Sequence, residues 1–392
     1  MNGSMNRLTL KRYLTMTTTS MIARRRWLRF SCRTLLVMTT LVCVWLGVEV
    51  KRARDLQKAV ALVSNLGGQV VYDYEQKDDQ LGFFSWEGSP AAPGWLRTAV
   101  GEEFFVEVNA VNFIEMQLDD AAFERMIEGV ARLRSLKSFG LECSRLTGRS
   151  LRRLDELGSL QYLVLHGVDC SAEELECLRN LRNLQDLCLS GKRIEGDAFV
   201  HLGPLKHLAS LAVRGDWFDD GAARDLASVR RLDTLNISSN SLTDAGLAHL
   251  SGLPTLTCLL IDSEQITDDG LEHVGRLTRL ERLVLTTSQS LPGGGVRSTD
   301  HITGEGFIHL RRLANLTSID LFGARVDAAG FAHLQRLPKL ESLRIENGRA
   351  LSAEAVDQLK KWRNLKFLET PLDPASEQEL YAALPGLFIY NP

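Results

Sequence analysis

The sequence lacks the short motifs by which metal and nucleotide sites are usually recognised. None of its seven cysteines forms a Cys-x-x-Cys pair, and their spacings match no metal-binding pattern. No Gly-x-Gly-x-x-Gly sequence or phosphate-binding loop is present, and the glycine run at 293–295 has no Lys-Ser or Lys-Thr after it. We therefore expect no cofactor, no metal site and no catalytic group, and so a protein that is not an enzyme.

The chain also lacks an excess of charge of either sign. Its 46 basic and 49 acidic residues leave a formal net charge of −3. A balance this near to neutral provides no general attraction to a polyanion, so we expect no nucleic-acid partner. The hydrophobic share of 44% is that of an ordinary globular protein, which leaves a folded binding or structural role open.

What the sequence does contain is leucine at a fixed interval. Each of these leucines opens the pattern Leu-x-x-Leu-x-Leu, as in Leu160-x-x-Leu163-x-Leu165, or a form of it with Ile, Val or Phe at a later place. A period of about 20–29 residues with this core predicts a leucine-rich-repeat solenoid, an α/β fold with parallel strands on the concave face and helices on the convex face. The leucines stand 24 residues apart, and the series resumes after one longer step: Leu136, Leu160, Leu184, Leu208, Leu232, Leu256 and Leu280, then Leu316 and Leu340.

The repeat at residues 253–276 indicates how each unit should form its strand. Leu259 and Ile261 alternate with Cys258, Leu260 and Asp262. Side chains alternate between the two faces of a strand. We therefore expect the first two residues to face the core and the other three to face solvent on the concave side.

A helix-capping residue recurs at one place in nearly every unit. Thr267 should cap a helix, because two aspartates follow it in the first turn, where the helix dipole favours negative charge. Only one unit departs, with Glu195 at this place. The recurrence predicts a helix in each unit. The capping residues are Asp119, Thr147, Ser171, Asp219, Thr243, Thr267, Thr303, Asp327 and Ser352.

Cysteine and histidine follow the repeat and form no site of their own. Cys170 takes the place that Ile194, Leu242 and Ile266 hold in other units, so we interpret it as a small buried hydrophobic residue, and the cysteines as free thiols instead of a disulfide framework. Five histidines share one slot of the repeat, which argues against a metal or proton-transfer role. They are His201, His249, His273, His309 and His333.

The details of the repeat resemble a bacterial class. Most plant and animal leucine-rich repeats carry Asn after Leu-x-Leu, and here Asn240 is the clear instance. The signature is instead Thr-Asp-x-Gly-Leu, at 243–247 and 267–271, which resembles the bacterial class of that pattern, related to ribonuclease-inhibitor-like and cysteine-containing repeats. The segments RRRWLRFS at 24–31 and LGGQVVYDY at 66–74 resemble the planctomycete-type membrane-anchored leucine-rich-repeat proteins. The resemblance covers nearly the whole chain from Arg24 and implies architecture and membrane location, but no particular ligand.

An uncharged apolar run at 34–48 follows a cluster of arginines near the N-terminus. It predicts one transmembrane helix, a signal-anchor over residues 34–50, although a spanning helix usually needs about 17–25 apolar residues. Two alternatives stay open. One is a cleaved signal peptide, for which no small-x-small site is evident near Gly47. The other is a buried helix of a soluble protein.

The basic residues also predict an orientation. Arginines are dense before the apolar run, whereas Glu49 and Asp55 dilute the positive charge after it. The positive-inside rule then makes residues 1–33 a cytoplasmic basic tail and puts the repeats of a single-pass protein outside the cytoplasm. Met21, which begins Met-Ile-Ala-Arg-Arg-Arg, is a possible true start; a disordered cytoplasmic tail is the alternative.

Residues 51–103 should form a juxtamembrane helix and an N-terminal capping region. Leu56, Val60 and Val63 recur at helical spacing, and Gly67-Gly68 should end that helix. A solenoid exposes its core at each end and needs such a cap. Residues 104–392 then hold about 10–11 leucine-rich repeats. An insertion loop at 287–301 lengthens one step; insertions are sometimes the binding element, and we favour a tolerated flexible loop.

The outward strand positions are the predicted binding surface, because solenoids use their concave faces to bind and because aromatic residues and Arg are frequent interface anchors. Trp217 replaces a polar residue of the repeat and should either contact a partner or pack on its neighbours. We expect charge reversal of the arginines to weaken binding with little change in stability. The candidate protein-binding residues are Tyr162, His166, Arg214, Trp217, Asp262, Arg282, Asp320, Phe322, Arg344 and Glu346.

The sequence thus predicts a non-enzymatic, membrane-anchored recognition scaffold that binds a protein or peptide through the concave face of its repeats. Two other functions stay open. One is a structural component of the cell envelope. The other is an adaptor subunit of a degradation or signalling complex, which the apolar N-terminal segment disfavours.

Overall fold

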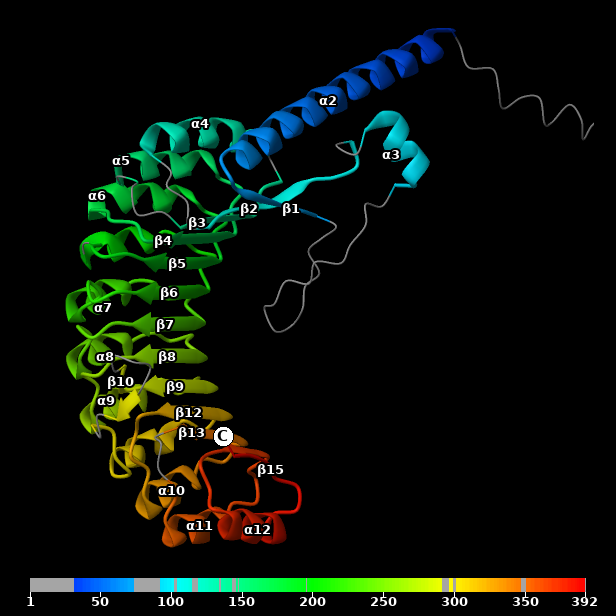
Figure 1. The fold of residues 1–392 in the computed structure, drawn as a ribbon. Coiled ribbons are helices and arrows are strands. Elements are labelled where there is room, and N and C mark those ends of the chain that lie inside the picture. Colours follow the sequence, from blue (N-terminus) through cyan, green and yellow to red (C-terminus); the bar gives the residue numbers. More distant parts are fainter. Residues whose placement is uncertain are drawn as a thin grey trace, which may run out of the picture.

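The repeats stack into a curved solenoid, with strands along the inner side of the curve and helices along the outer side (Figure 1). The computed structural model describes residues 32–73, 92–101, 104–114, 119–133, 135–142, 146, 148–194, 196–290, 296–298, 301–346 and 350–391. The predicted solenoid, with parallel strands on the concave face and helices on the convex face, is confirmed.

A thirteen-stranded sheet runs the length of the solenoid in chain order. Its first strand, β1 (Gln69–Tyr72), is antiparallel to β2 (Val108–Phe113), and all later neighbours are parallel. The other strands are β3 (Ser138–Glu142), β4 (Tyr162–His166), β5 (Asp186–Ser190), β6 (Ser210–Arg214), β7 (Thr234–Ser238), β8 (Cys258–Asp262), β9 (Arg282–Thr286), β12 (Ser318–Phe322), β13 (Ser342–Glu346), β14 (Phe367–Glu369) and β15 (Phe388–Tyr390).

The inward face of the strands is the one that the leucine spacing predicts. Leu259 lies beside Leu235 and Leu283 in the neighbouring strands and is 0% exposed. Ile261 is buried as well, whereas Leu260 is half-exposed on the other face. Stacking therefore joins the leucines of successive repeats into one continuous core.

Each repeat crosses the convex face through a short helical segment, and several of these segments are 3-10 helices. They are α4 (Asp120–Val130), α5 (Gly148–Leu151), η3 (Arg152–Glu156), α6 (Ala172–Leu175), η4 (Glu176–Asn180), η5 (Gly196–Leu202), α7 (Asp220–Leu226), α8 (Asp244–Leu250), α9 (Asp268–Val274), η6 (Gly306–Arg312), α10 (Ala328–Leu334), α11 (Ala353–Leu359) and α12 (Pro374–Ala383).

The predicted capping residues are found at the starts of these segments. A helix N–H donates to the side chain of Asp119, Asp219, Thr243, Thr267, Asp327 and Ser352. At Ser171 the carboxylate of Glu174 accepts from the backbone N–H, and at Thr303 the hydroxyl oxygen accepts from the N–H of Glu305. Thr147 and Glu195 lie outside the described residues.

Hydrogen bonds between neighbouring repeats explain the Thr-Asp-x-Gly signature. The carboxylate of Asp244 accepts from the backbone N–H of Thr267 at 3.0 Å and from its hydroxyl at 2.6 Å. A Cβ at Gly270 would collide with this carboxylate, so the position needs glycine. The signature therefore stabilises the stacking of one repeat on the next. Equivalent pairs are Asp220–Thr243 and Asp268–Thr303.

A single long helix, α2 (Cys32–Asn65), precedes the sheet and extends away from it (Figure 1). Its first half is exposed, with Trp45 at 60%, and Leu56, Ala59 and Val63 are buried in the core of the first repeats. The helix ends at Asn65, and Gly67 follows it with a positive φ of 79°, which suits a glycine after a helix. By length and composition, this is the one helix of the described residues that is apolar enough to cross a membrane.

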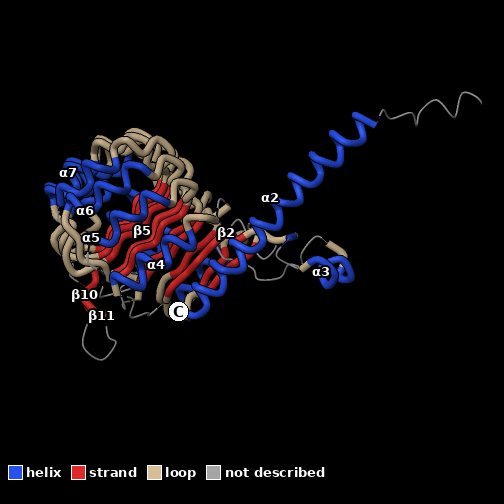
Figure 2. The backbone as a smooth tube through the Cα atoms, turned by 90° about the horizontal axis from the view of Figure 1, so that it is seen from above, coloured by secondary structure: helices blue, strands red, loops and turns tan. Residues whose placement is uncertain are grey.

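The insertion contains a small hairpin. Strands β10 (Ser288–Ser290) and β11 (Val296–Ser298) pair in antiparallel fashion, and Figure 2 shows them at the rim of the solenoid. Residues 291–295 and 299–300 lie outside the described residues. A short helix, α3 (Gly94–Val100), follows Pro93.

Candidate functional site

The outward side chains of the sheet form three rows along the concave face. The parallel register sets one residue beside its equivalent in the next repeat. The first row runs Tyr162, Asp186, Ser210, Thr234, Cys258, Arg282, Ser318, Ser342, Phe367 and Phe388. The second runs Val164, Cys188, Ala212, Asn236, Leu260, Val284, Asp320, Arg344, Glu369 and Tyr390. The third runs His166, Ser190, Arg214, Ser238, Asp262, Thr286, Phe322 and Glu346.

The middle of the concave face is lined by small side chains. Ser210 and Thr234 lie in the first row, and Cys188 and Ala212 in the second. The charged side chains in this part of the face are Asp186 in the first row and Arg214 and Asp262 in the third.

Two ion pairs cross the C-terminal part of the face. Nη2 of Arg282 lies 3.1 Å from Oδ2 of Asp320, whose side chain is only 8% exposed. Nε of Arg344 lies 2.6 Å from Oε2 of Glu369, which is also largely buried. Each arginine is held by a carboxylate on the next strand, so its remaining N–H donors are presented at a defined place.

Aromatic side chains follow these ion pairs at the end of the sheet. Phe367 stacks on Phe388, with ring centroids 5.8 Å apart and an interplanar angle of 13°. Phe388 is 63% exposed and Tyr390 is 52% exposed. Together with the two ion pairs, these residues form what we call the C-terminal patch: Arg282, Asp320, Arg344, Glu369, Phe367, Phe388 and Tyr390.

Sequence reasoning missed four residues of the C-terminal patch. Phe367, Glu369, Phe388 and Tyr390 lie on strands of only three residues. The leucine interval is irregular beyond Leu340, so the repeat pattern does not assign outward positions there. The alternation around Leu368 and Ile389, which are both buried, is the signal that marks these strands.

The N-terminal part of the face holds two of the predicted residues. Tyr162 is exposed on β4. Nδ1 of His166 lies 3.0 Å from the hydroxyl of Ser190, and Sγ of Cys188 lies 4.0 Å from Nε2 of His166. Burial raises the pKa of the Cys188 thiol, which Arg214 opposes in part, so the neutral thiol is favoured.

Trp217 lies in the turn after β6 and packs on its neighbours. Its indole stacks on Phe199 with centroids 6.0 Å apart, and Phe218 meets it edge to face. The Nε1–H donates to the carbonyl of Gly191 at 3.0 Å. The sequence left two roles open for Trp217, contact with a partner and packing on its neighbours. These contacts are those of a side chain that packs on its neighbours.

The remaining predicted residues are spread along the third row. Arg214, Asp262 and Glu346 are exposed, and Phe322 is half-buried. Asp262 accepts a hydrogen bond from the Ser238 hydroxyl at 2.9 Å. These residues share one face, but they lie on different strands over the length of the sheet and do not converge on a single point.

Within the part of the chain that the structure describes, no group of three or more His, Cys, Asp or Glu side chains is placed to hold a metal ion. Burial raises the pKa of the Asp186 carboxyl, while a hydrogen bond from Ser210 lowers it. What the geometry offers is an extended surface for contact.

Two solved structures to which this chain is similar are internalins. A crystal structure of an internalin from Listeria monocytogenes str. 4b F2365 is 18% identical, with a TM-score of 0.45, over 75% of this chain and 92% of that chain. Internalin C2 of the same strain is 20% identical, with a TM-score of 0.38, over 58% of this chain and 90% of that chain. A search of curated proteins gives no match.

The repeats themselves match a protein-family model. The model for the leucine-rich repeat region matches residues 102–316, which is more than half of the chain. The matched segment begins just before β2 and includes the Asp–Thr pairs that join successive repeats. The chain therefore belongs to the leucine-rich-repeat family.

Proposed function

We propose that this protein is a non-enzymatic recognition scaffold that binds a protein or peptide through its concave face. Leucine-rich-repeat solenoids present extended concave surfaces for binding. The observation that carries the proposal is the C-terminal patch, where two arginines and three aromatic side chains lie together. Aromatic residues and Arg are enriched in protein interfaces, and Tyr and Arg are among the residues that most often dominate the binding energy.

The exposed aromatic rings support a macromolecular partner. Phe388 and Tyr390 are large side chains left open to solvent beside fixed charges. Burial of such rings on binding releases apolar surface from water, and the arginine N–H groups add directional hydrogen bonds. A protein or peptide offers both the apolar area and the carbonyl or carboxylate acceptors that this surface needs.

We further propose that α2 holds the protein in a membrane, as a signal-anchor of the planctomycete-type class. The apolar half of α2 is exposed, with Leu35, Leu41 and Trp45 all open to solvent. The arginines that precede it in sequence favour a cytoplasmic N-terminus, with the repeats outside the cytoplasm. Anchoring of this kind would present the concave face to partners near the membrane surface.

Site-specific photocrosslinking tests the binding surface. A photoreactive amino acid replaces Phe388 or Arg214 on the concave face, or Val200 on the convex face, in the full chain within membranes. Val200 is exposed and apolar, so it is a matched control. We expect a discrete crosslinked partner from the two concave positions and none from Val200. Crosslinks from Val200 alone would overturn the assignment of the concave face.

Protease protection tests the orientation. Inverted inner-membrane vesicles present their cytoplasmic face to the added protease. The repeats should be spared in intact vesicles and digested once detergent is added. Digestion of residues 60–392 in intact vesicles would contradict an outward orientation while leaving the concave-face proposal standing.

A further inference from the structure

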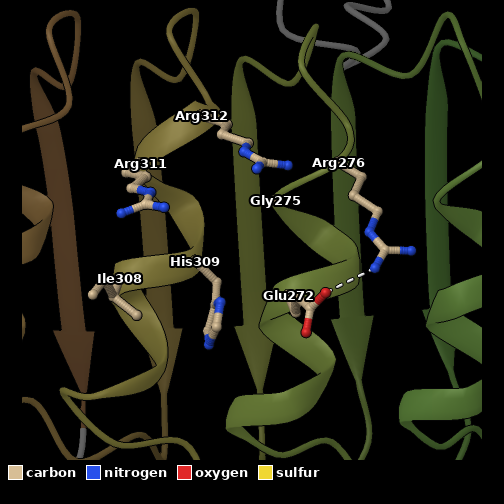
Figure 3. Close-up of a pocket in the computed structure, with 7 residues that line it drawn as sticks. All are labelled: Glu272, Gly275, Arg276, Ile308, His309, Arg311 and Arg312. Atoms are coloured by element: carbon tan, nitrogen blue, oxygen red, sulfur yellow. Dashed lines mark hydrogen bonds and ion pairs between the residues drawn. The ribbon is translucent and has the colours of Figure 1, made fainter.

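A hollow on the convex face lies between two neighbouring repeats, far from the concave rows (Figure 3). It opens between α9 and η6 and has a volume of about 240 Å³. A water molecule occupies about 30 Å³ of liquid, so the hollow has room for a small polyatomic ion. Its lining residues are Glu272, Gly275, Arg276, Ile308, His309, Arg311 and Arg312.

Gly275 lies where the two helical segments that border the hollow come close together. A Cβ at this position would collide with the carbonyl of His309, so glycine allows η6 to approach the end of α9 closely. In Figure 3 the guanidinium groups of Arg276 and Arg312 lie on opposite sides of Gly275, with the His309 ring below. The Arg276 guanidinium turns toward Glu272, whereas that of Arg312 extends toward Gly275.

The hollow carries more positive than negative charge. Nη2 of Arg276 lies 2.7 Å from Oε1 of Glu272, and this arginine lowers the pKa of the Glu272 carboxyl. Arg311 and Arg312 form no ion pair with any residue that the structure describes. Three guanidinium groups and one carboxylate therefore line the hollow, and Arg276 is the lining arginine that pairs with the carboxylate.

We propose that this hollow binds a tetrahedral oxyanion of the phosphate type through the guanidinium groups of Arg276 and Arg312. A guanidinium presents paired N–H donors that match two oxygens of a phosphate. Arg276 uses one edge for Glu272 and keeps other donors for the anion. The inference is independent of the concave-face proposal, because the hollow lies on the helices and not on the sheet.

Titration calorimetry with inorganic phosphate tests the site on the full chain in detergent, at constant ionic strength. We expect saturable binding to the unmodified protein. Loss of one charge-assisted contact should weaken it about tenfold in Arg312→Gln and in Arg276→Gln. Arg336→Gln is the matched control, because Arg336 occupies the slot of Arg312 in the next repeat and is exposed outside the hollow. Its affinity should be unchanged.

Glu272→Gln provides an opposite expectation. The Glu272 carboxylate is negatively charged, as phosphate is. Its removal takes away this repulsion and should tighten phosphate binding several-fold. A merely structural role for Glu272 would not increase affinity. Circular dichroism of each variant checks that these exposed substitutions leave the fold intact.

Related anions identify the ligand class. Sulfate should bind comparably to phosphate, and acetate much more weakly. Glycerol phosphate that binds as well as inorganic phosphate would identify a terminal phosphate ester as the ligand, and weaker binding would identify the free ion. The proposal is overturned by the absence of saturable phosphate binding, by an equal loss in Arg336→Gln, or by acetate that binds as tightly as phosphate.

Discussion

The guanidinium of Arg282 donates to the carboxylate of Asp320 at 3.1 Å across β9 and β12, the two strands that the insertion separates in sequence. The parallel register continues from Leu283 to Ile319 as it does between unbroken repeats. The insertion therefore leaves the sheet unchanged, and the ion pair ties its two sides together.

Arg282→Glu should destabilise the protein as well as alter its concave face. The change leaves the nearly buried Asp320 without its partner and adds a like charge beside it. A charged group that loses its hydrogen-bond partner costs roughly 1–3 kcal/mol of unfolding free energy. Denaturant unfolding followed by circular dichroism measures this loss.

Arg214→Glu is the control for that substitution. Arg214 is exposed in the third row, and exposed substitutions usually change stability by no more than about 0.5 kcal/mol. The expectation that arginine reversals leave stability unchanged therefore applies to Arg214, whereas Arg282 and Arg344 both hold largely buried carboxylates. Equal stabilities of Arg282→Glu and Arg214→Glu would mean that the Arg282–Asp320 pair contributes nothing.

Asp244→Ala should loosen the contact between two repeats. The substitution removes both hydrogen bonds to Thr267, which should cost about 1–3 kcal/mol because a half-buried N–H and hydroxyl lose their acceptor. Asp269→Ala removes an exposed aspartate of the next helix and should cost about 0.5 kcal/mol, through the helix dipole alone. Hydrogen exchange of the Thr267 amide reports the difference directly, and equal exchange rates in the two variants would refute the inter-repeat role.

Leu259→Ala should lower the unfolding free energy by about 2–5 kcal/mol, since it empties a site in the continuous core. Leu260→Ala, one residue further on the half-exposed face, should cost well under half as much. The comparison is made by chemical denaturation of the two variants. A smaller loss for Leu259→Ala than for Leu260→Ala would reverse the assignment of the two strand faces.

Asp186→Asn should stabilise the protein near pH 7. Burial raises the pKa of Asp186 in the folded state, so ionisation opposes folding. Below the ordinary aspartate pKa of about 4, Asp186 does not reduce the stability of the protein. The loss of stability grows as the pH rises through the folded-state pKa. Thermal unfolding at pH 4 and pH 7 should show a higher midpoint for the variant only at pH 7. A variant that is more stable only at pH 4 would contradict the sign.

The repeats could be predicted because each regular unit carries two local sequence signals, one for its strand and one for its helical segment. Leucine spacing assigns the inward face, as at Leu259, and a capping residue such as Thr267 marks where the helical segment starts. Neither signal depends on contacts between distant parts of the chain. Both strand faces and helix starts in the regular repeats therefore follow from local pattern.

The candidate surfaces could be predicted only in part, because they depend on which side chains of different repeats come into contact. Asp320 is outward by register, yet its ion pair with Arg282 keeps it nearly buried. Phe388 lies on a strand too short and too irregularly spaced for the pattern to assign. The hollow over Gly275 depends on how closely η6 approaches α9, which no local pattern specifies.

Helix α2 has a mechanical consequence for the repeats that follow it. The helix is unbroken from its exposed apolar half to Ala59 and Val63, which are buried in the core of the first repeats. The exposed half and the buried half belong to one continuous helix, so the helix holds the repeats in a fixed direction relative to its exposed half. A membrane or partner that fixes the exposed half of α2 therefore also fixes the direction in which the concave face points. The solenoid can then move relative to that half only as far as the helix bends.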